Sequence, residues 1–308
     1  MTQPTGTTRP TIWPKKTREL FHNHFDSTIW NDFQFRPDDI FIATYAKSGT
    51  TWLQQIIAQL IFNGQAGLNV SDMSPWVDLR LPPRHILQEM VEAQTHRRFL
   101  KTHLPLDALV YNPEARYIYV ARDGRDVIWS FFNHHLNMTP EMMADLNAMS
   151  ADDIEKFHPV DMEIRDYFLR WLEQDGYPLW SYWENITSWW AHRDLPNLML
   201  LHFNQLKADM PEQIRRIAAF LDIPIDENKW PDILTHCSFD YMKQHAENSA
   251  PMGGVAWEGG AKTFIHKGTN GRWRDILSAD DCARYEEVAR EKLGGDCAHW
   301  LKTGQLPT

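Results

Sequence analysis

The chain has 308 residues, of which 43% are hydrophobic and 23% charged, and its formal net charge is −10 at pH 7. This composition is typical of a globular protein with ample material for a core. The acidic balance argues against broad nonspecific binding of nucleic acid, which needs a basic surface, but it is compatible with a local basic pocket.

Cysteine usage and the N-terminal residues indicate a cytoplasmic protein. Cys237, Cys282 and Cys297 are widely spaced and form no CxxC pair, which fits neither a disulfide framework nor a zinc site. The first residues, MTQPTGTTRPTIWPKKTREL, contain no apolar secretory segment, and no apolar run approaches the roughly 18 residues of a membrane span. We therefore expect a cytoplasmic location, with neither membrane nor nucleic acid as a partner.

The first elements in chain order are a lead-in and a strand–loop–helix unit. Residues 1–38 are polar and contain several prolines and four expected aromatic anchors, Trp13, Phe21, Phe25 and Trp30. The apolar run DDIFIATY (38–45) predicts a buried strand. After a loop, TTWLQQIIAQLIF (50–62) has apolar residues at helical spacing.

The same pattern returns further along the chain. RRFLKTH (97–103) and ARYIYVAR (115–122) are predicted strands, and DGRDVIWSFFNHH (123–135) is a predicted helix. NLMLLHF (197–203) is predicted as the fourth strand, followed by the helix PEQIRRIAAFLDI (211–223). Strands that alternate with helices predict an α/β fold, with a central, mostly parallel sheet flanked by helices on both faces.

Two long segments interrupt this alternation. Residues 140–195 are strongly aromatic and mostly helical in pattern, whereas residues 246–275 are rich in glycine and basic side chains. The second segment is expected to form a long loop that acts as a lid. Neither a linker nor an internal repeat is evident, so residues 1–308 are predicted to form one domain.

The loop YAKSGTTW (45–52) resembles a phosphate-binding loop with its lysine on the unusual side. Lys47 precedes Gly49, whereas the lysine of the common P-loop, G-x-x-x-x-G-K-[ST], follows the second glycine. Backbone N–H groups at a helix start attract anions, and the Lys47 amine adds a charge. The alternative is an ordinary turn between strand and helix. The hydroxyl donors here are Ser48, Thr50 and Thr51.

Two further clusters follow predicted strands. KTH (101–103) places Lys101 and His103 on one face of a strand, where an imidazole can accept a proton from a bound hydroxyl near neutral pH. Arg122 ends the next strand and Ser130 lies in the second turn of the following helix, so a guanidinium and a hydroxyl could hold a phosphate. The structural alternatives are a core histidine and a salt-bridged arginine.

The segment HKGTNGRWR (266–274) joins three cations, Lys267 among them, to two glycines. Glycines let backbone approach a ligand and cations attract anions, although a flexible basic loop is the alternative. His134 and His135 could line an acceptor pocket, but packing is the simpler interpretation. No carboxylate cluster suggests a metal site.

Taken in order, YAKSGTTW, KTHLP, VARDGRDVIWS and KGTNGRW resemble the signature segments of the cytosolic-type sulfotransferases that use 3′-phosphoadenosine 5′-phosphosulfate (PAPS). The resemblance covers most of the chain. It implies a P-loop-like nucleotide-binding fold and transfer of a sulfuryl group from PAPS to a hydroxyl, with 3′-phosphoadenosine 5′-phosphate (PAP) as product and no metal required. The aromatic residues between 129 and 193 suggest a small, aromatic or partly apolar acceptor.

The resemblance also implies roles for matching residues. His103 would be the general base, Lys101 would lie beside the transferring group, and Lys47 would neutralise the leaving phosphate. Trp52 and Phe239 would enclose the adenine ring. The residues implied at the 5′-phosphosulfate are Lys47, Ser48, Gly49, Thr50 and Thr51, and those implied at the 3′-phosphate are Arg122, Ser130, His266, Lys267 and Gly268.

The chain departs from the family pattern at four positions. His266 stands where arginine is common and Phe203 where a tyrosine often reaches the nucleotide. Cys237 replaces a frequent threonine, and Arg272 a frequent aspartate. No departure removes a catalytic group.

Two other functions and one structural question stay open. A noncatalytic nucleotide-binding protein would keep the loop but could dispense with His103. An ATP-dependent P-loop kinase would need Mg²⁺, and both the position of Lys47 and the missing first glycine argue against it. A homodimer is left open, because the family's C-terminal dimer motif is not evident in RWRDILSADDCARYEEV.

Overall fold

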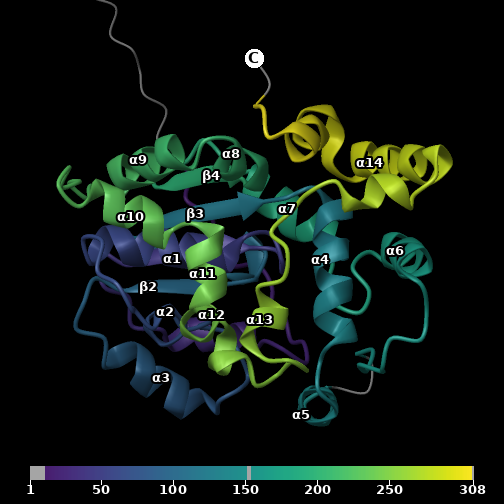
Figure 1. Cartoon of the computed structure of the whole chain (residues 1–308), viewed down its shortest axis with the longest axis horizontal. Helices are drawn as coiled ribbons and strands as arrows, with labels where there is room; N and C mark the ends of the chain where they lie inside the picture. The colour runs from purple at the N-terminus through teal and green to yellow at the C-terminus, as the bar shows by residue number, and fades with distance from the viewer. Residues whose placement is uncertain (1–10, 151–153, 307–308) are drawn as a thin grey trace, which may run out of the picture.

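Four parallel strands form the centre of the fold. The structure, a computed structural model, describes residues 11–150 and 154–306, so the first ten residues of the predicted lead-in lie outside the described residues (Figure 1). The strands lie in the order β2-β1-β3-β4. They are β1 (Ile40–Thr44), β2 (Phe99–Thr102), β3 (Arg116–Ala121) and β4 (Leu198–His202).

The register of the sheet brings the carboxyl ends of all four strands to one edge. Ile40 lies beside both Phe99 and Arg116, and Tyr117 lies beside Leu198. The predicted parallel sheet is therefore confirmed, and the residues that follow each strand lie near one another.

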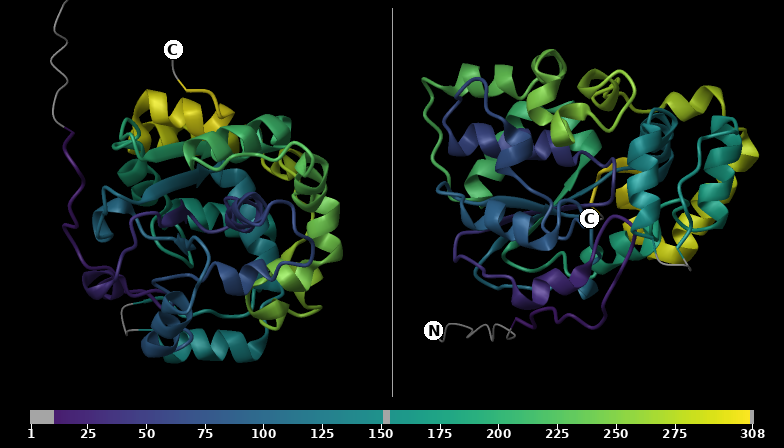
Figure 2. Two further views of the ribbon diagram at one scale, coloured as in Figure 1. Left: turned by 90° about the vertical axis from the view of Figure 1, so that its left-hand side faces the viewer. Right: turned by 90° about the horizontal axis from the view of Figure 1, so that it is seen from below.

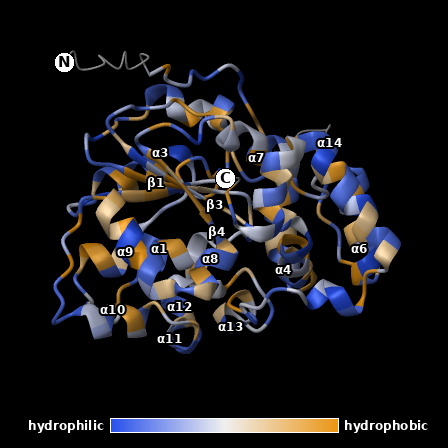
Figure 3. Cartoon of the chain, turned by 90° about the horizontal axis from the view of Figure 1, so that it is seen from above, coloured by the Kyte–Doolittle hydropathy of each residue, from blue (hydrophilic) through white to orange (hydrophobic). Residues whose placement is uncertain are grey.

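Helices cover both faces of the sheet. Alternate strand residues therefore pack in two separate cores, one on each face. Ile40 and Ile42 pack in one core with helix α1, whereas Phe41 and Tyr119 pack in the other with helix α7. Figure 3 shows the hydrophobic strands between helices that carry hydrophilic stripes. The first face holds α1 (Thr50–Ile61), α9 (Met210–Phe220) and α10 (Trp230–His236); the second holds α4 (Gly124–Leu136), α6 (Ile164–Glu173), α7 (Tyr182–Trp190) and α14 (Ala279–Thr303).

The lead-in packs on the second core through aromatic side chains. Phe25 and Trp30 are almost fully buried, and Trp13 stacks on Tyr111 with ring centroids 6.0 Å apart. Phe21, also expected as an anchor, is 49% exposed and is covered on one side by the Arg80 guanidinium. The anchor prediction is therefore wrong at this residue. The short helix of the lead-in is η1 (Ser27–Asp32).

The predicted end of the fourth strand needs correction. The strand expected over 197–203 ends at His202, and Phe203 begins helix α8 (Phe203–Ala208). The cause is a capping box: the His202 ring accepts from the Asn204 N–H, and the Gln205 side chain accepts from the His202 N–H. Histidine is not a usual N-cap residue, so no helix-start signal is present in the sequence at this position.

The segment 246–275, expected as one long loop, contains four short helical turns: α12 (Ala246–Ser249), η3 (Pro251–Gly254), α13 (Ala261–Phe264) and η4 (Arg272–Asp275). Four residues are too few to show helical periodicity in a sequence. The segment runs beside helix α2 (Figure 2), with which α12 and η3 are in contact. The remaining helices are α2 (Val70–Met73), α3 (Arg84–Glu92), η2 (Leu106–Ala108), α5 (Pro140–Ala148) and α11 (Phe239–Gln244).

In the described part of the chain, every helix is too short or too polar to span a bilayer.

Candidate active site

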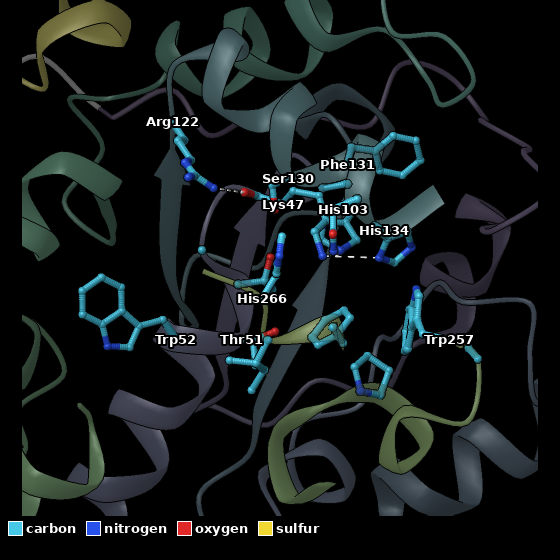
Figure 4. Close-up of a pocket in the computed structure, with 18 of the residues that line it drawn as sticks. Lys47, Thr51, Trp52, His103, Arg122, Ser130, Phe131, His134, Trp257 and His266 are labelled. Atoms are coloured by element: carbon cyan, nitrogen blue, oxygen red, sulfur yellow. Dashed lines mark hydrogen bonds between the residues drawn. The ribbon is translucent and has the colours of Figure 1, made fainter. Parts of the chain in front are cut away.

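A cavity of about 340 Å³ opens at the carboxyl edge of the sheet. Lys47 follows β1, His103 follows β2, Arg122 follows β3 and Phe203 follows β4, and all four side chains line the cavity. Figure 4 shows the first three of them. The fold thus gathers residues that are far apart in the sequence.

All but one of the site residues predicted from the sequence line this cavity. The exception is Ser48, which is buried and whose Oγ has no hydrogen-bond partner among the described residues. The lining members are Lys47, Gly49, Thr50, Thr51, Trp52, Lys101, His103, Arg122, Ser130, Phe203, Phe239, His266, Lys267 and Gly268.

The loop between β1 and α1 has the backbone of an anion site. Lys47 has a φ of 66° and Gly49 a φ of 117°, and a Cβ atom on Gly49 would lie 2.9 Å from the Phe203 ring. Helix α1 begins at Thr50 without a side-chain cap. Its first N–H groups therefore remain available to a ligand at the positive end of the helix dipole.

The Lys47 amine lies between aromatic and imidazole groups rather than beside a carboxylate. Its Nζ is 3.3 Å from His134 Nδ1 (Figure 4) and 4.2 Å from the centroid of the Phe264 ring. Burial, with contributions from Arg122 and Lys101, lowers the pKa of Lys47 to about 7. Burial also lowers the pKa of Lys101, to about 8. A nearby anion would favour the protonated, charged form of both amines.

His103 is held in the tautomer that a general base requires. Its Nδ1 lies 2.7 Å from the Thr44 carbonyl oxygen. A carbonyl can only accept, so Nδ1 carries the proton and Nε2 is left unprotonated. Thr44 Oγ1 lies 3.1 Å from the same Nδ1 and 2.6 Å from Thr50 Oγ1, which links the base to the anion loop. Burial and the Lys101 charge lower the pKa of His103 to about 3.

Arg122 connects the sheet edge to the basic segment 266–274. Its guanidinium donates to Asn270 Oδ1 at 2.6 and 3.0 Å, to the Thr269 carbonyl at 3.2 Å and to the Lys47 carbonyl at 3.1 Å. It also lies 4.3 Å from the Phe203 ring centroid. Burial lowers the pKa of Arg122 to about 10.

The basic segment is fixed to the body of the protein by several backbone contacts. Lys207 donates to the Gly268 carbonyl at 2.7 Å, and the Gly271 N–H donates to Asp126 at 2.6 Å. A Cβ atom on Gly268, whose φ is 59°, would lie 2.7 Å from the Phe239 ring. Glycine thus lets the backbone lie against this aromatic face.

The charge of the cavity wall is strongly positive although the whole chain is acidic. Lys47, Lys101, Arg122, Lys207, Lys267 and Arg272 line it, and among the described lining residues there is no aspartate or glutamate. At this basic end, Ser48 Oγ, His266 Nδ1 and Arg272 Nε are buried without a partner among the described residues. Such a wall fits an anion that carries charge at more than one point, as a nucleotide with two separate phosphates does.

The other end of the cavity is apolar and aromatic. Trp76 lies next to β2, where its flanking residues pair with Lys101, and Trp76 and Thr102 both donate to the buried Asp78 carboxylate. Further apolar lining residues are Leu79, Leu81, Met138, Met142, Leu146, Leu179, Trp180 and Trp257.

Sequence reasoning missed several residues of this end. The sequence favours a packing role for His134, whereas this residue lines the cavity and contacts Lys47. His24, Trp76 and Trp180 also line the cavity. They come from segments without a motif, and only the folded chain brings them to β2.

Within residues 11–150 and 154–306, no group of three or more His, Cys, Asp or Glu side chains is placed to hold a metal ion. That no metal is required stays a prediction.

Comparison with known proteins identifies the family. Residues 37–296 match the family model described as "Sulfotransferase domain". The chain is 28% identical over 303 residues to a glycolipid sulfotransferase of Mycobacterium tuberculosis, covering 91% of this chain and 92% of the relative. It is 28% identical over 276 residues to sulfotransferase 1B1 of Mus musculus, covering 86% of this chain and 85% of that protein.

Solved structures show the same fold. A mouse sulfotransferase, SULT7A1, complexed with PAP superposes with a TM-score of 0.69 at 23% identity, covering 90% of this chain and 92% of that one. Retinol dehydratase in a complex with retinol and PAP gives a TM-score of 0.67 at 24% identity, covering 86% and 84%. Together with the match of the family model over most of the chain, this confirms the predicted family: the chain belongs to the sulfotransferases.

Proposed function

We propose that this enzyme uses PAPS as its donor and transfers the sulfuryl group to a hydroxyl of a small, neutral, apolar or aromatic acceptor. The observation that carries the proposal is the His103 ring, whose unprotonated Nε2 belongs to the same cavity wall as the buried amines of Lys47 and Lys101. The PAP found in the mouse sulfotransferase and retinol dehydratase structures supports the choice of nucleotide.

The lining residues fit PAPS at both of its charged ends. Lys47 and the start of α1 would hold the 5′ end, while Arg122, Ser130 and Lys267 would hold the 3′-phosphate. Trp52 and Phe239 would enclose the adenine. Trp52 is oriented by a 2.8 Å hydrogen bond from its Nε1 to the Cys237 carbonyl. When bound, PAPS supplies an activated sulfuryl group on a phosphate leaving group.

In this scheme His103 Nε2 accepts the proton of the acceptor hydroxyl, and the imidazolium that forms keeps its Nδ1–H on the Thr44 carbonyl. The Lys47 and Lys101 amines stabilise the negative charge that moves towards the leaving phosphate. The low pKa of His103 in the free cavity is a response to burial and to Lys101. An anionic ligand beside it raises that pKa, which makes the ring a stronger base in the complex.

The cavity wall also restricts the acceptor. The apolar end favours a hydrocarbon or aromatic body, and no carboxylate lines the described wall to balance a cationic amine. Neutral alcohols and phenols therefore fit best. A glycolipid sulfotransferase among the relatives and the retinol and androsterone complexes of retinol dehydratase are compatible with this class.

The test is the substitution His103→Ala. We expect kcat to fall by about 10²–10⁴, because a positioned general base contributes that much, while the affinity for PAP measured by calorimetry stays within a factor of two to three. His192→Ala, outside the cavity, is the matched control and should keep both values. Unchanged turnover in His103→Ala would show that another group removes the proton, and absence of PAP binding by the unsubstituted enzyme would overturn the choice of nucleotide.

A further inference from the structure

A second histidine, His24, lies in the acceptor end of the cavity with one ring nitrogen unused. It comes from the lead-in just before η1, and its backbone carbonyl is fixed by a 2.9 Å hydrogen bond from the Arg80 N–H. Its Nδ1 is 2.7 Å from Asn23 Oδ1. Its Nε2 makes no hydrogen bond with any of the described residues.

Aromatic rings surround His24, those of three apolar residues and that of His22. The His24 ring centroid lies 6.1 Å from that of Trp76, 6.0 Å from that of Trp180 and 5.4 Å from that of Phe157. A polar nitrogen between aromatic walls is costly to desolvate unless a ligand meets it with a hydrogen bond. Burial lowers the pKa of His24 well below its usual range, with smaller contributions from His22 and His103, so the ring is neutral and suits a neutral polar group.

His24 and the proposed base touch the same pair of indoles. Trp76 lies 4.5 Å from His103 and Trp180 lies 5.9 Å from it, measured between ring centroids. A flat acceptor whose reacting hydroxyl is at His103 would therefore lie along Trp76 and Trp180, with its far end directed to His24.

Asn23 lets the imidazole present either a donor or an acceptor. As oriented, the Asn23 oxygen accepts from His24 Nδ1–H, which leaves Nε2 as an acceptor. The buried Asn23 Nδ2 has no partner among the described residues. Turning the amide over would make Nδ1 the acceptor and Nε2–H the donor. A hydroxyl or a carbonyl could then be recognised.

We propose that His24 is a second polar anchor of the acceptor site, so that preferred acceptors are ring-based alcohols or phenols that carry a second hydroxyl or carbonyl at the end remote from the reacting hydroxyl. The proposal rests on the sulfotransferase function proposed above and narrows the substrate class of the same site.

The experiment compares dihydroxynaphthalenes (the 1,5-, 1,6-, 2,6- and 2,7-isomers) with 1- and 2-naphthol. This rigid series places the second hydroxyl at different distances from the first. We expect at least one isomer to have a kcat/KM about tenfold above that of its parent naphthol, which exceeds the factor of two that a second reactive hydroxyl gives by statistics. In His24→Phe this preference should fall to about twofold, and His24→Gln should retain part of it.

His22→Phe is the matched control, because the His22 ring lies 5.7 Å from that of His24 but does not line the acceptor cavity. An equal loss of preference in His22→Phe would assign the effect to packing and overturn the proposal, as would an unchanged preference in His24→Phe. Melting temperatures check that the variants are folded.

Binding of the same compounds can be measured by quenching of tryptophan fluorescence with PAP present. This measurement distinguishes a failure of the proposed sulfuryl transfer from a failure of the proposed His24 anchor. If no naphthol is sulfated but the binding preference is lost in His24→Phe, the proposed reaction fails and the polar anchor stands. If naphthols are sulfated and bound without any preference for a second hydroxyl, the anchor is wrong and the proposed reaction stands.

Discussion

The Lys47 amine lies in a site that disfavours its positive charge. Burial and the neighbouring cations Arg122 and Lys101 lower its pKa to about 7, so the amine loses its proton near neutral pH when no anion is present. A phosphate group beside it would favour the charged form. Nucleotide binding should therefore be coupled to uptake of a proton.

This coupling gives a prediction with a definite sign. As pH rises from 7 to 9, PAP affinity should fall, because the lysines with lowered pKa values must be reprotonated to bind; each such group weakens binding by up to about tenfold per pH unit. Calorimetry in buffers of different ionisation enthalpy measures the proton uptake directly. Lys47→Arg, which stays charged, should reduce the uptake, and Lys229→Met at an exposed site should not. A pH-independent affinity would contradict the assignment.

Site residues that lie in a short local motif could be predicted from the sequence. Site residues that are placed only by long-range contacts could not. Lys47, His103 and Arg122 each follow a strand within a short motif, so adjacency in the sequence was enough. His24 and Trp76 belong to irregular segments, and their place depends on contacts such as the pairing of Trp76 with Lys101. No local pattern encodes such contacts.

At the scale of elements, the start of α4 is the point where three other helices meet. Gly124 packs against Trp171 of α6, Tyr182 of α7 and Tyr285 of α14, and its N–H donates to the Tyr285 hydroxyl at 2.9 Å. The orientation of α4, which carries Ser130 and His134 to the cavity, depends on this close approach.

We expect Gly124→Ala to destabilise the protein by about 1–3 kcal/mol, the usual cost of overpacking a filled core. The added Cβ would lie 2.7 Å from the Trp171 ring and 2.9 Å from the Tyr285 hydroxyl. Urea denaturation measures the change. Gly295→Ala in α14 is the control, since a Cβ there meets nothing within 4 Å, and alanine favours a helix. Equal stability of the two variants would show that the helices shift freely.

Element boundaries show the same limit of sequence reasoning. The helical spacing of apolar residues predicts helix α1, whereas α8 starts through the unusual cap at His202. The short turns of the segment 246–275 are supported by contacts with the body of the protein, such as that between Lys243 and the His266 carbonyl. These contacts do not exist until the chain has folded.

At the scale of the whole molecule, many histidines are kept neutral by burial. Burial lowers the pKa of six of them strongly: His22, His24, His103, His134, His135 and His202. It lowers the pKa of His266 less. Below pH 6.5 the unfolded chain binds protons that these folded rings do not, so the folded state loses stability as pH falls.

We therefore expect acid sensitivity between pH 6.5 and pH 5. At pH 5.5 each buried histidine should lower the free energy of unfolding by about 1 kcal/mol. Urea midpoints at pH 7.5 and 5.5 test this. His22→Phe removes one titrating ring and should reduce the loss by about one sixth, whereas His85→Phe at an exposed position should not. Equal midpoints at the two pH values would be incompatible with burial of neutral rings.

The hydrogen bonds between Arg122 and Asn270 bear on the rate at which a nucleotide can enter. The Asn270 amide and a 3′-phosphate would compete for one guanidinium, so association should proceed by encounter followed by an exchange of partners. Stopped-flow traces should show an observed rate that reaches a plateau at high PAP concentration, set by release of Asn270. Asn270→Ala should raise that plateau. The Asn270 side chain, which has no role in the chemistry, would thus limit the rate of nucleotide association.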